Sequence, residues 1–301
     1  MTQIPSGGHY VWASEDEKYL FLSISEQGRK GNQLFFKKSM QTKDTFRPIS
    51  TDMDASIYPV QNYESRVYFY TDQNAPNSKV VSADLDNLDK GLRDVLPESD
   101  NSLDDINIVG GKMIAVYMID VTDKVFVYDL DGKFRYELKL PSPGNVFGFN
   151  GRKDDKTVFY GFTSMISPQS IYLYDIEKNE SKLFRSSEVK FNPDEYESKQ
   201  VFFSSKDGTR VPMFLVYKKG LKLDGNNPVY LYGYGGFSIS MKPYFSISRI
   251  ILLENGGVFA MPCIRGGGEY GEKWHEAGTK LNKQNVFDDF IAAAEYLIAE
   301  K

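Results

Sequence analysis

Three glycines, a tyrosine and a phenylalanine near residue 235 form the segment of this chain best suited to chemistry. Tyr234 lies between Gly233 and Gly235, and Gly236 and Phe237 follow. A tyrosine hydroxyl can donate a hydrogen bond to the negative charge that develops on a carbonyl oxygen during acyl transfer, where one such donor is worth roughly 3–4 kcal/mol. Glycines allow a sharp turn and a close approach of backbone to substrate. The residues alone leave two roles open for Tyr234: this one, or packing on the preceding strand.

A second glycine-rich segment, residues 265–271, reads RGGGEYG. It lacks both the Lys-Ser/Thr pair of a phosphate-binding loop and the G-x-G-x-x-G spacing, so nucleotide binding is not predicted. Its glycines are expected to relax a bend after a strand. Arg265 is expected to pair with an acidic residue that the sequence does not identify.

The other reactive side chains indicate no further site. His9 and His275 are the only histidines. Neither has companions at metal-ligand spacing, so we predict no metal site and no cofactor. His275 is expected to be structural. Cys263, the single cysteine, lies in an apolar strand and is expected to be a small buried residue rather than a reactive thiol.

Apolar strands precede both glycine-rich segments. Residues 229–232 run into the first, residues 257–264 run into the second, and a helix is predicted to follow. Upstream, residues 200–204 and 211–217 are predicted to form a hairpin about Asp207-Gly208. An α/β-hydrolase domain opens in this order, with a glycine-rich turn that supplies part of the oxyanion hole before a G-x-S-x-G nucleophile turn. The 301 residues contain no G-x-S-x-G sequence.

The terminal helix is predicted to have an apolar face and an acidic face. The apolar face is expected to cover the sheet, and it comprises Phe287, Phe290, Ile291, Ala294, Leu297 and Ile298. The opposite face is expected to carry the acidic residues, Asp288, Asp289, Glu295 and Glu300. This helix is interpreted as scaffold.

A repeat occupies the first two-thirds of the chain. Each unit has an aromatic-rich strand, a polar loop and a second strand that often ends in aspartate. Corresponding positions, Phe21, Phe69, Val116 and Tyr160, are 48, 47 and 44 residues apart. Periods in the forties with several strands per period indicate β-propeller blades. A β-sandwich with coincidental spacing is the alternative. The predicted strand pairs are residues 19–24 with 33–36, 66–70 with 79–84, 112–117 with 125–129, and 156–160 with 171–175.

Composition excludes several classes of partner. Lys plus Arg number 36 and Asp plus Glu number 41, which gives a net charge of −5. This mildly acidic balance provides no footprint for nucleic acid or for an anionic membrane. No apolar run reaches the roughly 18 residues that a membrane span needs. One cysteine fits a reducing compartment, so a cytoplasmic location is predicted, with the periplasm as the alternative.

Residues 201–301 resemble the prolyl oligopeptidase family of serine peptidases, in four motifs of the right order and spacing. These are residues 205–213 (SKDGTRVPM), 231–237 (LYGYGGF), 264–271 (IRGGGEYG) and 283–298 (KQNVFDDFIAAAEYLI). The resemblance implies that the hydroxyl of Tyr234 points into the oxyanion hole and that Phe237 lines a proline pocket. It also implies a Ser-His-Asp triad, and short proline-containing peptides as substrates, cleaved after proline.

The resemblance also implies an architecture. The family has a seven-bladed propeller followed by an α/β-hydrolase domain, and about four blades fit before residue 190. We therefore predict a partial propeller over residues 1–190 and the first part of the hydrolase domain over residues 191–301. The chain is expected to be an internal fragment whose parent extends at both ends and holds the triad. The alternative is a non-catalytic propeller module that binds peptides or protein partners.

Overall fold

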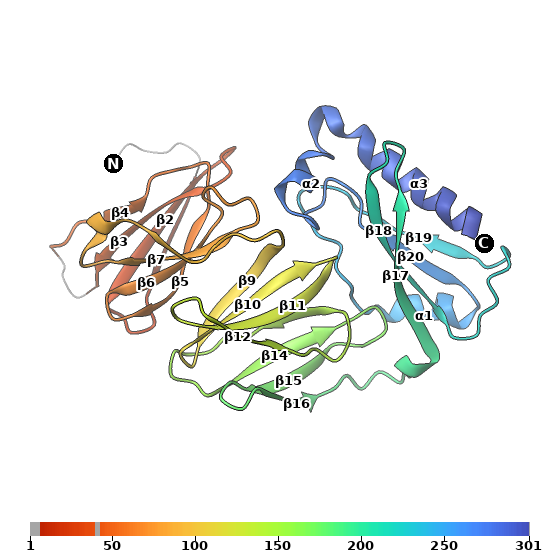
Figure 1. Cartoon of the computed structure of the whole chain (residues 1–301), viewed down its shortest axis with the longest axis horizontal. Coiled ribbons are helices and arrows are strands. Elements are labelled where there is room, and N and C mark those ends of the chain that lie inside the picture. Colours follow the sequence, from red (N-terminus) through yellow and green to blue (C-terminus); the bar gives the residue numbers. More distant parts are fainter. Residues whose placement is uncertain (1–6, 40–42, 301) are drawn as a thin grey trace. The chain divides into compact units, whose positions relative to one another are not determined.

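The computed structural model describes residues 7–39 and 43–300, and these form five four-stranded sheets and three α-helices (Figure 1). Short 3-10 turns lie at Leu88–Lys90, Pro193–Glu195 and Lys280–Asn282. Contacts divide the chain into two units. The first comprises residues up to 115, 126–136 and 150–156, and the second comprises residues 116–125, 137–149 and 157–301. The predicted division between residues 190 and 191 stays a prediction.

Between residues 7 and 185, the described chain forms four sheets in which the strands pair in chain order. The first sheet has strands β1 (Gly7–Ala13), β2 (Tyr19–Glu26), β3 (Asn32–Lys38) and β4 (Arg47–Ser50). The second has β5 (Ile57–Tyr63), β6 (Arg66–Thr71), β7 (Lys79–Asp84) and β8 (Arg93–Leu96). The third has β9 (Ser102–Val109), β10 (Lys112–Ile119), β11 (Thr122–Asp129) and β12 (Phe134–Leu138). The fourth has β13 (Asn145–Gly148), β14 (Thr157–Thr163), β15 (Ser170–Asp175) and β16 (Glu180–Arg185).

The predicted repeat is confirmed. The strand pairs expected from the spacing are the second and third strands of the four sheets, and each pair is hydrogen-bonded. In the first and second sheets, the first strand and the last strand have fewer buried positions than the two central strands, which is why the sequence pattern marks them less clearly.

Aromatic side chains join neighbouring sheets of the first unit. One apolar core contains side chains of both the first and the second sheet, among them Phe21, Phe36 and Phe69. Tyr68 and Tyr70 extend from the second sheet, and their hydroxyls donate hydrogen bonds to the carbonyl oxygens of Leu130 and Leu103, at 3.1 and 3.0 Å. Stacked four-stranded sheets of this kind are the blades of a β-propeller.

The fifth sheet belongs to the second unit and has the order β17-β18-β20-β19. Strands β17 (Tyr196–Ser204) and β18 (Arg210–Lys218) form the predicted hairpin. Strand β20 (Val258–Pro262) is antiparallel to β18, and β19 (Val229–Leu231) is parallel to β20. The mixed sheet opens the α/β-hydrolase domain that the sequence predicts.

Both faces of this sheet are covered by helices. Met213, Leu215 and Ala260 share a core with α3 (Gln284–Glu300). The alternate residues Phe214 and Met261 share a core with Leu253 of α1 (Ile247–Glu254). Side chains alternate between the faces of a strand, so a sheet covered on both faces has continuously apolar strands. A short helix, α2 (Glu272–Glu276), lies between β20 and α3.

The predicted orientation of the terminal helix is wrong. Val286, Asp289, Ala292 and Ala293 are the buried residues of α3. Phe287, Ile291 and Ile298, which were expected to cover the sheet, are 54%, 53% and 78% exposed, whereas Phe290 and Leu297 do pack against the core. The helix has apolar residues around most of its circumference, and a buried ion pair of Asp289, described below, selects the face that turns inward.

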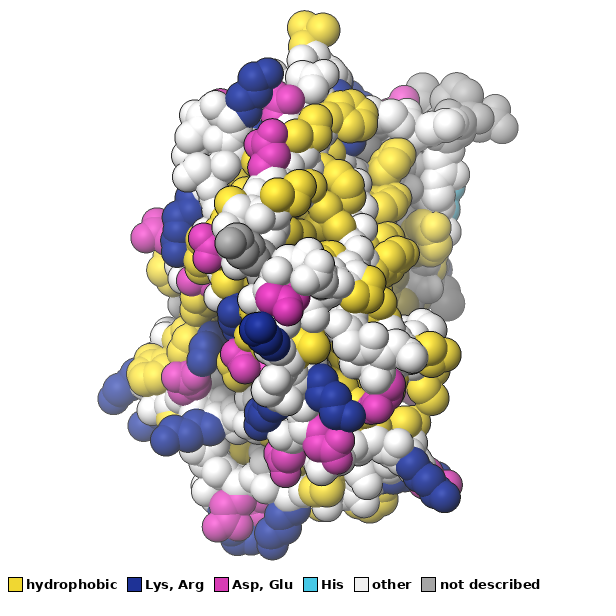
Figure 2. All heavy atoms as spheres, turned by 90° about the vertical axis from the view of Figure 1, so that its right-hand side faces the viewer, with side chains coloured by type: hydrophobic (Ala, Val, Ile, Leu, Met, Phe, Trp, Pro, Cys, Tyr) yellow, Lys and Arg dark blue, Asp and Glu magenta, His cyan; other side chains and the backbone are white. Residues whose placement is uncertain are grey.

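Strand β19 is an edge of the fifth sheet with an apolar surface. Val229 and Tyr230 are 46% and 56% exposed. A groove of about 470 Å³ lies beside this strand and the end of α3, lined in part by Leu231, Val258 and Leu297. Figure 2 shows apolar side chains gathered over the part of this face that carries α3 and the sheet edge. Among the described residues, none of the helices combines the length and the apolarity that crossing a membrane requires.

Candidate active site

Tyr234 lies in the loop that leaves strand β19. Its side chain is 44% exposed, and that of Phe237 is 84% exposed. Within residues 7–39 and 43–300, no group forms a hydrogen bond with the Tyr234 hydroxyl. This hydroxyl is therefore free to donate to a group from outside the described chain, and the Phe237 ring offers an apolar surface three residues further along.

The backbone of this loop is held in a conformation that requires glycine. Gly235 has φ +60°, and a Cβ atom there would lie 2.6 Å from both Ile264 Cγ1 and Val286 Cγ1. Phe237 and Ser238 also have positive φ, at 54° and 56°, which is uncommon for residues other than glycine. The Gly235 position is thus closed to any larger residue, by conformation and by space together.

The two glycine-rich segments contact each other through their backbones. Ser238 N donates to Gly266 O at 3.1 Å. A Cβ atom on Gly266 would stand 2.6 Å from Gly235 O. The glycines of residues 266–268 were expected only to relax a bend after the strand. They also let this segment approach the Tyr234 loop at a distance that no side chain would permit.

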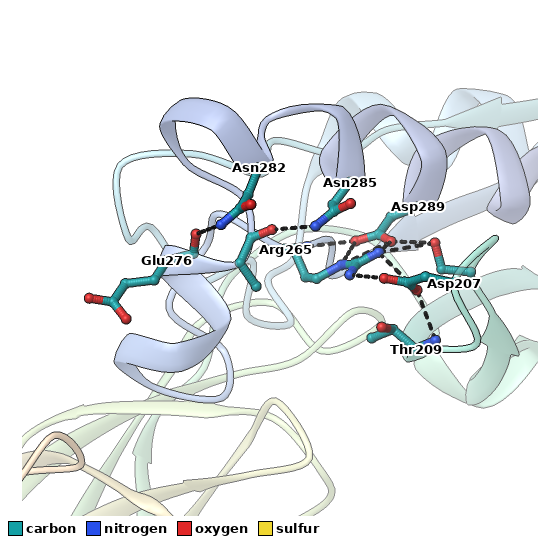
Figure 3. Close-up of polar contacts among 9 residues, drawn as sticks. Asp207, Thr209, Arg265, Glu276, Asn282, Asn285 and Asp289 are labelled. Carbon is teal, nitrogen blue, oxygen red and sulfur yellow. Dashed lines mark hydrogen bonds and ion pairs between the residues drawn. The ribbon is translucent and has the colours of Figure 1, made fainter.

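A buried network holds the second segment and supplies the acidic partner that the sequence left unidentified (Figure 3). Arg265 is 4% exposed and lies between Asp289 of α3 and Asp207 of the β17–β18 turn. Its Nη2 atom is 2.6 Å from Asp289 Oδ1, and its Nη1 atom is 2.5 Å from Asp207 Oδ2. Ser205 Oγ donates to Asp289 Oδ1 at 2.5 Å. The hydrogen bond from Arg265 holds the pKa of Asp207 well below its usual range.

Burial of charged groups is stabilising only when the geometry compensates for lost hydration. Asp289 is fully buried, and its second oxygen accepts hydrogen bonds from both the backbone N and the Nε of Arg265, each at 3.0 Å. Asn285, near the start of α3, also donates to Ala277 O at 2.9 Å, and Asn282 donates to Glu276 O at 3.2 Å (Figure 3). Helix α3 is therefore fastened to the segment that supports the Tyr234 loop.

Glu269 anchors the stretch that follows Phe237. It is 2% exposed, and its Oε1 accepts a hydrogen bond from Met241 N at 2.8 Å. Burial raises the pKa of this carboxyl to about 7. Lys242, which follows Met241 in sequence, forms an ion pair at 2.7 Å with the buried Asp123. The chain on the C-terminal side of Phe237 is thus held at two consecutive residues.

His275 and Cys263 have the structural environments that were expected. His275 Nδ1 lies 2.8 Å from Gly266 O, the same oxygen that accepts the hydrogen bond from Ser238 N. Cys263 is completely buried, and burial raises the pKa of its thiol. Among the described residues, no three His, Cys, Asp or Glu side chains gather in a way that could hold a metal ion.

Sequence reasoning identified no supporting role for Lys283, Glu269 or Asp289. It placed Asp289 on the face of the terminal helix that points away from the sheet, whereas Asp289 is buried. Lys283 Nζ donates to Gly235 O at 2.7 Å, across 48 positions of sequence. Glu269 and Asp289 lie within the motifs that carry the family resemblance, but no spacing rule connects them to Met241 or to Arg265. Their partners are far away along the chain, and only folding brings them together.

The fold agrees with comparisons against known protein families. Residues 5–187 match the prolyl oligopeptidase N-terminal beta-propeller domain, and residues 243–301 match the prolyl oligopeptidase family. The chain belongs to the prolyl oligopeptidase family. Tyr234 and Phe237 lie between the two matched stretches, so their roles rest on the motif and the geometry.

Several similar proteins are named prolyl endopeptidase or prolyl oligopeptidase. The prolyl endopeptidase of Elizabethkingia meningoseptica is 45% identical over 96% of this chain and 41% of its own length. That of Dictyostelium discoideum is 36% identical over 99% of this chain and 42% of its length. A solved structure of prolyl oligopeptidase B from Galerina marginata, bound to a 35mer hydrolysis and macrocyclization substrate, is 35% identical in sequence. It superposes with a TM-score of 0.91, and the match covers 100% of this chain and 44% of the chain in that structure. The chain thus spans about two fifths of the length of these relatives.

Proposed function

We propose that this chain is part of a serine endopeptidase that hydrolyses short peptides after proline. Tyr234 stabilises the oxyanion of the acyl-transfer step, and Phe237 forms a wall of the pocket for the proline ring. We use the name extended enzyme for a polypeptide that carries these 301 residues together with the further segments that the longer relatives contain. The single cysteine among these 301 residues supports a cytoplasmic location.

The observation that carries the proposal is the Tyr234 hydroxyl. Tyr234 is 44% exposed, and its hydroxyl has no hydrogen-bond partner among the described residues. The loop that carries it is held by glycine packing, by Lys283 and by the Gly266 contact. A donor that is fixed before the reaction needs no reorganisation when charge develops, which is the arrangement that lowers the barrier most.

Phe237 supports the choice of proline as the recognised residue. Its ring is 84% exposed and is presented by a backbone of positive φ. A proline ring is small, rigid and apolar, and an aromatic wall covers it without requiring hydrogen bonds. Met241 and Lys242 fasten the segment that follows Phe237.

In the extended enzyme, a serine from a G-x-S-x-G turn would attack the carbonyl carbon, and a histidine would accept the serine proton. The negative charge that forms on the carbonyl oxygen would meet the Tyr234 hydroxyl. The propeller would restrict access to the site, so that folded proteins are not cleaved.

A conservative substitution tests the assignment. In the extended enzyme, Tyr234→Phe should lower kcat by about 100- to 1000-fold with little change in KM, because the hydroxyl acts mainly in the transition state. The assay follows hydrolysis of a blocked dipeptidyl-proline amide with a fluorogenic leaving group. Tyr230→Phe, on the neighbouring strand, is the matched control and should retain full activity.

Two results would contradict the proposal. Full kcat in the Tyr234→Phe variant would remove the oxyanion role. Absence of any hydrolysis by the extended enzyme would favour the non-catalytic peptide-binding module instead. The 301-residue chain serves as the negative control, since it contains no G-x-S-x-G sequence and is expected to be inactive.

A further inference from the structure

A lysine at the start of the terminal helix reaches the loop that carries Tyr234. Lys283 directly precedes α3, and its Nζ donates a hydrogen bond to the Gly235 carbonyl oxygen at 2.7 Å. No carboxylate in residues 7–39 and 43–300 forms an ion pair with this ammonium group. The lysine therefore directs its charge to a backbone oxygen one residue beyond the tyrosine.

The ammonium group and the tyrosine ring lie beside the same glycine. A Cβ atom built on Gly236 would be 3.9 Å from Lys283 Nζ and 3.9 Å from Tyr234 Cε1. Gly235, which lies between Tyr234 and Gly236 in sequence, has φ +60°. The carbonyl belongs to the Gly235–Gly236 peptide, so holding it restricts rotation at Gly235, the residue that joins this peptide to Tyr234.

Glycine-rich loops need external fastening because glycine has wide conformational freedom. A hydrogen bond from a charged donor is roughly twice as strong as one between neutral groups. Other hydrogen bonds of the loop include those from Ser238 N to Gly266 O and from Tyr232 N to Ala260 O, which lie on either side of the Gly235 peptide. Lys283 is the side chain that holds this peptide directly.

We propose that Lys283 is a positioning residue for the oxyanion donor. Its ammonium group holds the Gly235 carbonyl, and the peptide so fixed places the Tyr234 hydroxyl where negative charge develops. The inference rests on the proposed function of Tyr234. It adds a residue that acts through the tyrosine without contacting the substrate.

The first test is a set of lysine variants in the extended enzyme. Lys283→Met keeps the length of the side chain but loses the donor, so kcat should fall about 10-fold with KM changed less than about twofold, because small misplacements of a catalytic group are costly. Lys283→Arg keeps a charged donor and should recover most of this loss. Lys280→Met, on an exposed neighbour in the same segment, is the matched control and should match the wild type.

A double variant separates positioning from a general effect on the fold. In a Tyr234→Phe background, Lys283→Met should cause no further loss of kcat, because no hydroxyl remains to be placed. A further 10-fold loss in that background would overturn the proposal, as would a Lys283→Met variant with wild-type kcat.

A second readout is independent of activity. The carbonyl 13C resonance of Gly235, observed in glycine-labelled protein, should move in Lys283→Met and should stay in place in Lys280→Met. An unchanged resonance in Lys283→Met would overturn the proposed contact. If the extended enzyme cleaved no prolyl substrate, the proposed function would fail, while this resonance would still decide whether Lys283 holds the loop.

Discussion

At the scale of single residues, buried polar groups decide the geometry of the candidate site. Arg265, Asp289 and Glu269 are all at most 4% exposed. The first two compensate each other by charge and by several hydrogen bonds. No cationic group of the described residues pairs with Glu269, and its burial favours the neutral form. The charge of Glu269 therefore depends on pH near neutrality.

Glu269 should make stability depend on pH. Burial raises the pKa of this carboxyl from 4.5 to about 7 in the folded chain. Between these values the unfolded chain loses a proton that the folded chain keeps, so the free energy of unfolding should fall by about 3 kcal/mol as pH rises from below 4.5 to above 7. Urea unfolding of the extended enzyme across this pH range measures the slope.

Glu269→Gln should remove this contribution, since the amide oxygen still accepts from Met241 N and carries no charge. At pH 8 the variant should be more stable than the wild type. Glu276→Gln, an exposed position on α2, is the control and should keep the slope. A Glu269→Gln variant with the wild-type slope would show that another group is responsible.

At the scale of elements, α3 shows why periodicity can select the wrong face. The helix has apolar side chains at Phe287, Ile291 and Ile298, yet these lie largely in solvent. The buried positions are Val286, Asp289, Ala292 and Ala293. Small residues bring the helix close to the sheet, and the ion pair of Asp289 with Arg265 sets its rotation.

Two substitutions on α3 test this orientation. Ala293 is fully buried, so Ala293→Leu should overpack the core and lower the free energy of unfolding by about 1–3 kcal/mol. Phe287→Ala, at a position that is 54% exposed, should change it by less than about 0.5 kcal/mol. Urea unfolding of the extended enzyme measures both. The reverse ranking would restore the orientation expected from periodicity.

At the scale of the whole molecule, two sheets of the described chain have open edge strands with apolar side chains. Strand β1 is an edge of the first sheet, with Tyr10 and Val11 65% and 60% exposed. Strand β19 is the edge of the fifth sheet and borders the apolar groove described above. Unpaired strand edges with apolar side chains template association with other chains.

The 301-residue chain, expressed alone, should therefore self-associate or unfold over a broad, non-cooperative thermal transition. Size-exclusion chromatography with light scattering measures the mass, and circular dichroism follows unfolding. The extended enzyme is the comparison and should remain monodisperse under the same conditions. A monodisperse 301-residue monomer with one sharp transition would contradict this prediction and would favour an independently closed propeller module.

Local signals in the sequence were sufficient for much of this architecture. The period of the repeat identified the central strands of four sheets, and Asp207-Gly208 identified the hairpin, because turn chemistry and strand alternation act between near neighbours. The glycines around Tyr234 identified the loop, and the role of Tyr234 itself stays a prediction. These features depend on backbone conformation, which the residue types restrict directly.

Only the tertiary structure decided how the loop is held and which face of α3 is buried. Lys283 meets Gly235 across 48 positions, Glu269 meets Met241 across 28, and Asp289 meets Arg265 across 24. A periodic pattern averages over a helix face and treats an acidic residue as solvent-exposed. Whether such a residue is buried depends on the balance between lost hydration and the partners that distant segments supply, and that balance exists only once the chain has folded.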